Sequence, residues 1–125
     1  LTLIDESYNA NAASMRAALS VLGSIPTEGR RVAILGAMGE LGDLSAEMHH
    51  GLAEPIRAAG ADPVLLVGDA MTPLADEINA PIVSNVDAAK AWLQDEVRAG
   101  DTLLLKGSNS VGLSALVAMM VEGQL

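Results

Sequence analysis

Short apolar runs alternate along this chain with segments whose apolar residues recur at helical spacing. Several of the runs are continuously apolar, as in strands buried on both faces of a parallel sheet. Such alternation is typical of βαβ units, in which helices cover both faces of the sheet. The sequence therefore predicts an α/β fold, a three-layer αβα sandwich with a mainly parallel, Rossmann-like sheet, in one domain over residues 1–125. The predicted strands are Leu1–Asp5, Arg31–Leu35, Pro63–Val67, Pro81–Val83 and Thr102–Leu105.

Apolar stripes between these runs predict the helices. Pro55 is expected to kink the second helix or to shift its boundaries. Asp69 is a candidate N-cap for a short helix, and Asn85 for the helix after it. The stripes are Met15, Ala18, Leu19 and Leu22; Met48, Leu52 and Ile56; Ala89, Trp92, Leu93 and Val97; and Leu113, Leu116, Val117 and Met120.

Composition excludes several classes of function. The net charge is −9, and the seven basic residues are scattered, which argues against binding to nucleic acid. The chain has no cysteine, so disulfides, thiolate metal sites and a cysteine nucleophile are excluded, which fits the cytoplasm. No apolar run approaches the roughly 18–20 residues of a membrane span. The chain opens with Leu1 inside an apolar run, from which we expect a segment of a longer protein.

Ligands of a parallel α/β sheet bind beyond the carboxyl ends of its strands. The first loop there is 5–11, Asp-Glu-Ser-Tyr-Asn-Ala-Asn, which is rich in groups that bind ribose hydroxyls, amides or phosphate oxygens. A polar turn with Asn11 as N-cap explains the same residues, and from this loop alone it is the favoured interpretation.

Two further loops follow strands. Residues 35–42, Leu-Gly-Ala-Met-Gly-Glu-Leu-Gly, allow close backbone approach, but they lack the Gly-Lys-Ser/Thr of a P-loop and the glycine spacing of a dinucleotide fingerprint. Residues 106–110, Lys-Gly-Ser-Asn-Ser, suit a carboxylate or phosphate, or else form a solvated lysine before a Ser-capped helix. His49 and His50 show no metal spacing; we expect His49 to be a polar contact near the second loop and His50 to lie on the surface.

Together, these loops resemble motifs of the Mur ligases. Residues 5–11, followed by Ser-Met-Arg-Ala-Ala-Leu at 14–19, are similar to the opening of the C-terminal domain of these enzymes. The second loop resembles their Leu-Gly-Asp-Met-x-Glu-Leu-Gly motif, with His49 at the position of a family histidine. Residues 106–108 resemble their Lys-Gly-Ser-Arg motif. The motifs occur in the family's order and spacing along the whole chain, and they fit best the branch that adds a D-alanyl-D-alanine dipeptide.

The resemblance implies ATP-dependent amide formation in peptidoglycan synthesis. In that branch, a carboxylate of a UDP-N-acetylmuramoyl tripeptide is phosphorylated to an acyl phosphate, and the amine of D-Ala-D-Ala then displaces phosphate. Lys106 and Ser108 would bind the dipeptide carboxylate, and no catalytic residue or metal ligand is implied. The implied nucleotide contacts are Glu6, Tyr8, Asn9 and Asn11; those on the dipeptide side are Gly39, Glu40, Leu41, Gly42, His49, Lys106 and Ser108.

The phosphate-binding loop, the Mg²⁺ ligands and the UDP-sugar pocket of the family lie in preceding domains. The resemblance thus implies that this chain is the C-terminal domain of a larger ligase. It would supply contacts to ATP and the dipeptide, have no ligase activity alone, and bind either ligand weakly at most. Three positions depart from the family: Ala37 replaces an Asp, Asn109 an Arg and Ala12 a Pro. The first two bear on dipeptide specificity.

Other functions fit parts of the sequence. Folylpolyglutamate synthetase and other Mur ligases share the motifs, but they tend to carry a histidine where this chain has Tyr-Asn-Ala-Asn at 8–11. A stand-alone flavodoxin-like or receiver-like regulatory module would use the acidic pair Asp5 and Glu6, yet Ala37 and Gly68 leave no phosphate acceptor. A purely structural domain is the third alternative.

Overall fold

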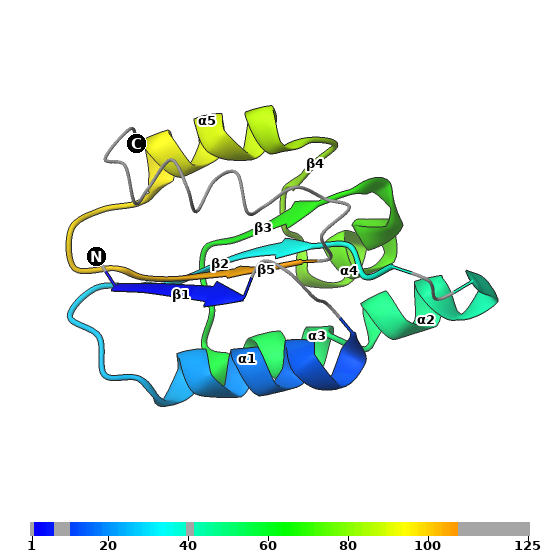
Figure 1. The fold of residues 1–125 in the computed structure, drawn as a ribbon, viewed down its shortest axis with the longest axis horizontal. Helices are drawn as coiled ribbons and strands as arrows, with labels where there is room; N and C mark the ends of the chain where they lie inside the picture. Colours follow the sequence, from blue (N-terminus) through cyan, green and yellow to red (C-terminus); the bar gives the residue numbers. More distant parts are fainter. Residues whose placement is uncertain (1, 7–10, 40–41, 108–125) are drawn as a thin grey trace.

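The structure, a computed structural model, describes residues 2–6, 11–39 and 42–107 of the chain (Figure 1). Within them, five strands form one sheet in the order β1-β5-β2-β3-β4, and every neighbouring pair is parallel. The predicted parallel α/β fold is confirmed. Each predicted strand lies within one residue of its observed bounds. These are β1 (Thr2–Glu6), β2 (Arg31–Gly36), β3 (Val64–Val67), β4 (Ile82–Val83) and β5 (Thr102–Lys106).

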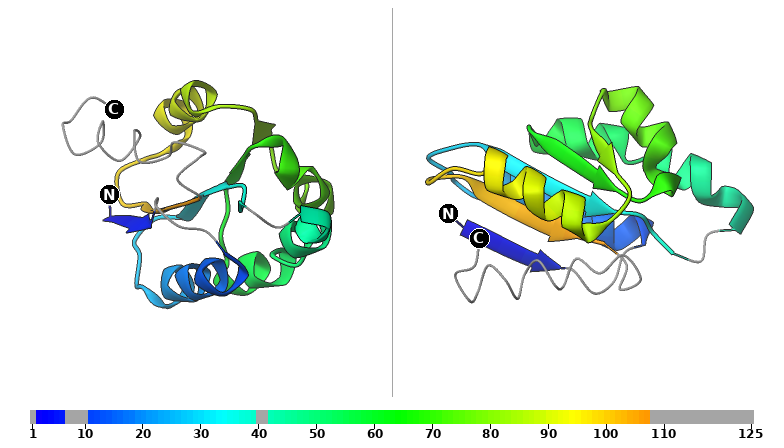
Figure 2. Two further views of the ribbon diagram at one scale, coloured as in Figure 1. Left: turned by 45° about the vertical axis from the view of Figure 1, so that its right-hand side comes forward. Right: turned by 90° about the horizontal axis from the view of Figure 1, so that it is seen from above.

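Helices cover both faces of the sheet, as the αβα prediction required (Figures 1 and 2). The α-helices are α1 (Ala12–Ser24), α2 (Ser45–His50), α3 (Ala53–Ala59), α4 (Thr72–Ile78) and α5 (Val86–Glu96), and two 3-10 turns are η1 (Gly42–Leu44) and η2 (Asp69–Met71). In the described part of the chain, no helix is long and apolar enough to cross a membrane. The helix predicted around 113–120 lies outside the described residues.

Alternate residues of the central strands enter two separate cores. Ala33 and Leu35 of β2 pack with the buried stripe of α1 and with residues of α3 and α4. Val32 and Ile34, on the other face, pack with α5, where Trp92 lies against the core as predicted. The period of two in a strand therefore divides each apolar run between the two faces. This explains why β2 reads as one continuous apolar run.

Two of the three predicted N-caps are confirmed, the third is wrong, and the second predicted helix is interrupted. Asn11 and Asn85 cap α1 and α5, each accepting the backbone N–H three residues on, at 2.8 and 2.9 Å. Asp69 was wrong as an N-cap: it is the first residue of η2, and no side chain caps that turn. The second helix is two helices, because α2 ends before Gly51 and α3 starts anew at Ala53. Pro55 lies in the first turn of α3, where its missing N–H costs nothing.

The strand order defines where a ligand is expected. The chain proceeds from β2 to β3 and β4 on one side, whereas β5 inserts on the other side, between β2 and β1. The order of the strands therefore reverses at β5, and ligands of such sheets bind beyond the carboxyl ends of the strands at the point of reversal. In Figure 1, α2 extends beyond this end of the sheet. The fold therefore directs attention to the segments that leave β2 and β5.

Candidate functional site

The three predicted loops leave adjacent strands at one edge of the sheet. In the parallel register, Glu6 at the end of β1 lies opposite Lys106 at the end of β5. Lys106 in turn lies opposite Leu35 of β2. The third loop therefore starts between the first and the second. We call the carboxyl ends of β1, β5 and β2, with the loops that follow them, the carboxyl edge.

Asn11 has a structural task at this edge. Its side-chain oxygen accepts the Ser14 N–H at 2.8 Å, while the Ser14 hydroxyl accepts the Asn11 N–H at 3.0 Å. This reciprocal pair is a capping box, which satisfies N–H groups at the start of α1. The backbone of Glu6 ends β1, and Tyr8 and Asn9 lie outside the described residues. Nucleotide contacts by these four residues therefore stay a prediction.

Lys106 lies inside the carboxyl edge. Only 4% of its surface is exposed, and the following Gly107 is also buried. A buried ammonium group is costly unless the protein supplies partners, and Lys106 does interact with other groups of the chain. The Lys106 side chain is thus held within the protein where β1, β5 and β2 end together. Ser108, its predicted companion, lies outside the described residues.

The start of the second loop, just after β2, is held in place by a hydrogen bond and by side-chain packing. The Ala37 N–H donates to the Val67 carbonyl at the end of β3, at 2.9 Å. The Met38 side chain is buried in the core below α1 and α3. After Met38, Gly39 is exposed, and Gly42 has a φ of +57°, a conformation that favours glycine. Glu40 and Leu41 lie outside the described residues.

His49 is fully buried, and both of its ring nitrogens are bonded within the protein. Nε2 lies 2.8 Å from the Met38 backbone nitrogen, which donates to it. Nδ1 lies 2.7 Å from the Ser45 carbonyl oxygen, which can only accept. The ring is therefore neutral and carries its proton on Nδ1. The predicted polar contact near the second loop is present, with the loop's own backbone as partner. His50 is exposed, as expected.

Sequence reasoning did not identify two participants in this loop. Met38 takes part through its backbone N–H, which no sequence motif reveals. Gly68, after β3, has a φ of +108°, and a Cβ placed on it would lie 3.1 Å from the Ala37 Cβ. Gly68 thus leaves space for Ala37, the residue that departs from the family's aspartate. A glycine following a strand was the only available signal.

Among the described residues, the strongest shift in pKa lies at the opposite edge of the sheet, at Asp101. Burial by itself raises the pKa of the Asp101 carboxyl, but hydrogen bonds from the Arg30 guanidinium and from the Arg30 and Arg98 N–H groups outweigh it. They lower the pKa of Asp101 to about 2. The same hydrogen bond raises the pKa of Arg30. Because Arg30 and Asp101 precede β2 and β5, this pair joins strand starts and does not belong to the carboxyl edge.

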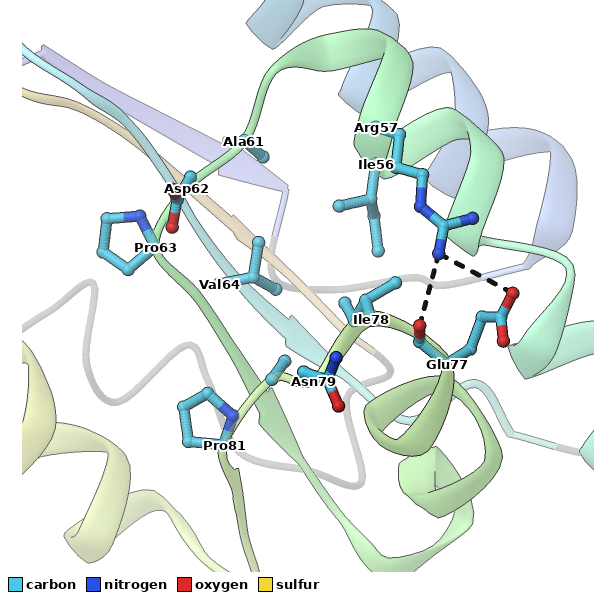
Figure 3. A pocket seen from close by; sticks show the side chains of 11 residues that line it. Ile56, Arg57, Ala61, Asp62, Pro63, Val64, Glu77, Ile78, Asn79 and Pro81 are labelled. Atoms are coloured by element: carbon cyan, nitrogen blue, oxygen red, sulfur yellow. Dashed lines mark hydrogen bonds and ion pairs between the residues drawn. The ribbon is translucent and has the colours of Figure 1, made fainter.

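A cavity of about 400 Å³ also lies away from the carboxyl edge. Figure 3 shows it between the ends of α3 and α4 and the starts of β3 and β4. Arg57 donates to the Glu77 carbonyl at 3.2 Å and pairs with the Glu77 carboxylate at 3.6 Å. Arg57 and Glu77 in the lining of the cavity are thus directed at each other. Among the described residues, no group of three His, Cys, Asp or Glu side chains could hold a metal ion.

A parallel sheet with polar and glycine-rich loops at its topological switch point defines an α/β ligand-binding domain. Comparison with known proteins narrows this class, since the family "Mur ligase, glutamate ligase domain" matches residues 1–109. The chain belongs to this family, which confirms the predicted resemblance.

Curated relatives and solved structures agree with this assignment. The UDP-N-acetylmuramoyl-tripeptide–D-alanyl-D-alanine ligases of Synechocystis and Escherichia coli are 36% and 35% identical over 97% and 96% of this chain. The structure of MurF from Acinetobacter baumannii matches 96% of the chain with a TM-score of 0.82 and 29% identity. That of MurF ligase from Thermotoga maritima in complex with ADP matches 94%, with a TM-score of 0.73 and 26% identity. The chain spans only 27–28% of the length of these four proteins.

Proposed function

We propose that this chain is the C-terminal domain of a cytoplasmic ATP-dependent ligase of peptidoglycan synthesis. The complete enzyme adds D-Ala-D-Ala to a UDP-N-acetylmuramoyl tripeptide. The observation that carries the proposal is the carboxyl edge: three segments with the family's motifs leave three adjacent strands, with Lys106 opposite both Glu6 and Leu35. Curated relatives named for this activity match nearly the whole chain.

The reaction has two steps that balance without a redox partner. A substrate carboxylate oxygen attacks the γ-phosphorus of ATP, which releases ADP and forms an acyl phosphate. The dipeptide amine then attacks the acyl carbon, loses a proton and expels phosphate. This chain contributes binding and orientation, which convert an encounter of two substrates into a reaction at fixed geometry. The relative from Thermotoga maritima was solved in complex with ADP, in agreement with a nucleotide ligand.

Each loop has a role in this proposal. The first loop, with Glu6, Tyr8, Asn9 and Asn11, meets the sugar and base of the nucleotide. Residues 39–42 form the dipeptide side, with His49 behind them, and Lys106 with Ser108 meets the dipeptide carboxylate. The described residues offer no metal cluster, so we assign the Mg²⁺ ligands to other parts of the enzyme and derive no step through the ion.

The test is the activity of the complete enzyme. Purified enzyme with ATP, Mg²⁺ and the UDP-N-acetylmuramoyl tripeptide should release phosphate only when D-Ala-D-Ala is added, with formation of the UDP-linked pentapeptide. Glutamate in place of the dipeptide should give no product. Product with glutamate and none with D-Ala-D-Ala would assign the chain to another branch. The isolated chain should release no phosphate under any of these conditions.

Lys106→Met tests the assignment of the dipeptide carboxylate. Loss of a charged hydrogen bond costs about 1.5–3 kcal/mol, so the KM for D-Ala-D-Ala should rise about 10–100-fold, with a much smaller change in the KM for ATP. The chain's other lysine, Lys90 on α5, provides the matched control, and Lys90→Met should change neither constant. Equal increases in both KM values for Lys106→Met would contradict the proposal that Lys106 binds the dipeptide carboxylate.

A further inference from the structure

His49 connects the two ends of the second loop by hydrogen bonds from its ring. Met38 precedes the exposed segment and Ser45 follows it. The ring of His49 accepts the N–H of the first at 2.8 Å and faces the carbonyl of the second at 2.7 Å. We call these three residues the His49 bridge. Met38 and His49 are eleven positions apart in the sequence, and the described residues Gly39, Gly42, Asp43 and Leu44 between them are exposed.

Both supports of the bridge are fixed in the core. Met38 is only 5% exposed, and the preceding Ala37 N–H is held by Val67 of β3 at 2.9 Å. On the other side, α2 packs against α4 and η2. The described residues between these supports, Gly39, Gly42, Asp43 and Leu44, are exposed. The relative placement of the two ends of the loop, Met38 and Ser45, therefore depends on the bridge, because a short loop is ordered by how its ends are held.

We propose that His49 is a positioning residue for the dipeptide side of the site: it fixes Met38, where the second loop leaves β2, relative to Ser45, where α2 begins, and it acts through the Met38 N–H and does not touch the substrate. The part concerning the dipeptide rests on the function proposed above. Burial favours this role over a ligand contact, because neither ring nitrogen is open to a ligand. A mere core residue would not need a polar ring with two directed hydrogen bonds.

The bridge requires a neutral ring. If Nε2 gained a proton, two N–H donors would face each other and the Met38 bond would be lost. Among the described residues, no carboxylate is hydrogen-bonded to the ring in a way that would favour the charged form. The charged groups on the elements around it are all exposed: Asp43 of η1, Glu47 and His50 of α2, Asp69 of η2, and Asp76 and Glu77 of α4.

Two substitutions separate the two hydrogen bonds in the complete enzyme. The oxygen of His49→Gln reaches the position of Nε2 and can still accept the Met38 N–H. The amide of His49→Asn reaches only the position of Nδ1 and keeps the Ser45 carbonyl alone. We expect His49→Asn to raise the KM for D-Ala-D-Ala about 10–100-fold with a smaller effect on the KM for ATP, and His49→Gln to stay within about threefold of wild type. His50→Asn, the same change on the exposed neighbour, should have no effect.

Equal kinetic effects of Asn and Gln at position 49 would overturn the proposal. A second measurement needs no substrate and no variant: in wild-type enzyme labelled with ¹⁵N-His and ¹⁵N-Met, NMR should detect a coupling between the Met38 amide nitrogen and Nε2 at neutral pH. Its absence at neutral pH would refute the bridge even if His49→Asn fails to fold. If wild-type enzyme joins no dipeptide but shows the coupling, the proposed function fails while the bridge stands.

Discussion

Asp101 shows how one residue can join two strands. Its carboxylate is 2.9 Å from the Arg30 Nη2 and also accepts the backbone N–H groups of Arg30 and Arg98. The Arg30 guanidinium also donates to the Glu96 carbonyl at the end of α5. Backbone and side-chain donors thus converge on a carboxylate that is almost fully buried. The pair connects the starts of β2 and β5, the two strands that flank the switch point.

The lowered pKa of Asp101 predicts how stability depends on pH. Its folded value of about 2 lies below the ordinary 3.8, so the charged carboxylate stabilises the fold above about pH 4. This contribution, about 2 kcal/mol at most, is lost as the pH falls through 4 toward 2. Urea unfolding should show Asp101→Asn to be less stable than wild type at pH 7, and the gap should narrow at pH 3. Asp95→Asn, on the exposed face of α5, serves as control; a gap independent of pH would contradict the prediction.

Gly29 next to this pair allows a second prediction. A Cβ at this position would lie 2.6 Å from Asp101 Oδ1 and 2.8 Å from the Gly100 carbonyl carbon. Gly29→Ala must therefore displace Asp101 or the backbone of Gly100, at a cost of about 1–3 kcal/mol in the free energy of unfolding. At Gly51, whose φ is −62°, the nearest contact would be an ordinary 3.4 Å. Gly51→Ala should leave the midpoint of thermal unfolding almost unchanged; equal losses for both would contradict the steric argument.

The same residues show what a sequence can reveal at this scale. Asn11 and Asn85 were predictable as caps because each precedes an apolar stripe and capping acts over three residues. The partners of His49 and Asp101 were not predictable. Met38 contributes a backbone group, and Arg30 lies 71 positions from Asp101 in the sequence. Contacts of this kind depend on the order of the strands, which no local pattern contains.

At the scale of elements, α1 combines a structural and a proposed ligand-binding role in its N-cap. Asn11→Ser replaces the capping amide oxygen with a hydroxyl that can also cap the helix, but it removes the amide proposed to meet the nucleotide. We expect stability within about 0.5 kcal/mol of wild type, because serine and asparagine are similar N-caps. In the complete enzyme, the KM for ATP should nevertheless rise. Asn85→Ser makes the same change on α5, away from the carboxyl edge, and should alter neither property.

Strands were easier to predict than helices for a physical reason. A buried parallel strand is a continuous apolar run, so its ends are visible where the run stops. The stripe of Met48, Leu52 and Ile56, in contrast, continues across the break between α2 and α3. Both helices bury apolar residues in one core, so periodicity alone does not show the turn at Gly51. The sequence predicted that the site lies at the carboxyl ends of the strands. It did not predict that β5 inserts between β1 and β2.

At the scale of the whole molecule, charge limits what the chain can bind alone. Its net charge is −9, and it contains no Gly-Lys-Ser/Thr phosphate loop. The nucleotide contacts proposed here are polar groups for ribose and base. The phosphates of ATP would therefore add no attraction in the isolated chain and some repulsion, most of all at low salt.

The Kd values of adenosine, ADP and ATP show which part of the enzyme binds the phosphates. With the isolated chain, the three Kd values should agree within about threefold and be weak, in the range of about 1 mM or above. With the complete enzyme, affinity should increase strongly from adenosine to ATP, because the other domains supply the phosphate and metal contacts. A cooperative thermal unfolding transition would first establish that the isolated chain is folded. If a folded chain instead bound ATP at least tenfold more tightly than adenosine, the phosphates would have to be held here, and the proposed split of the nucleotide site between domains would be wrong.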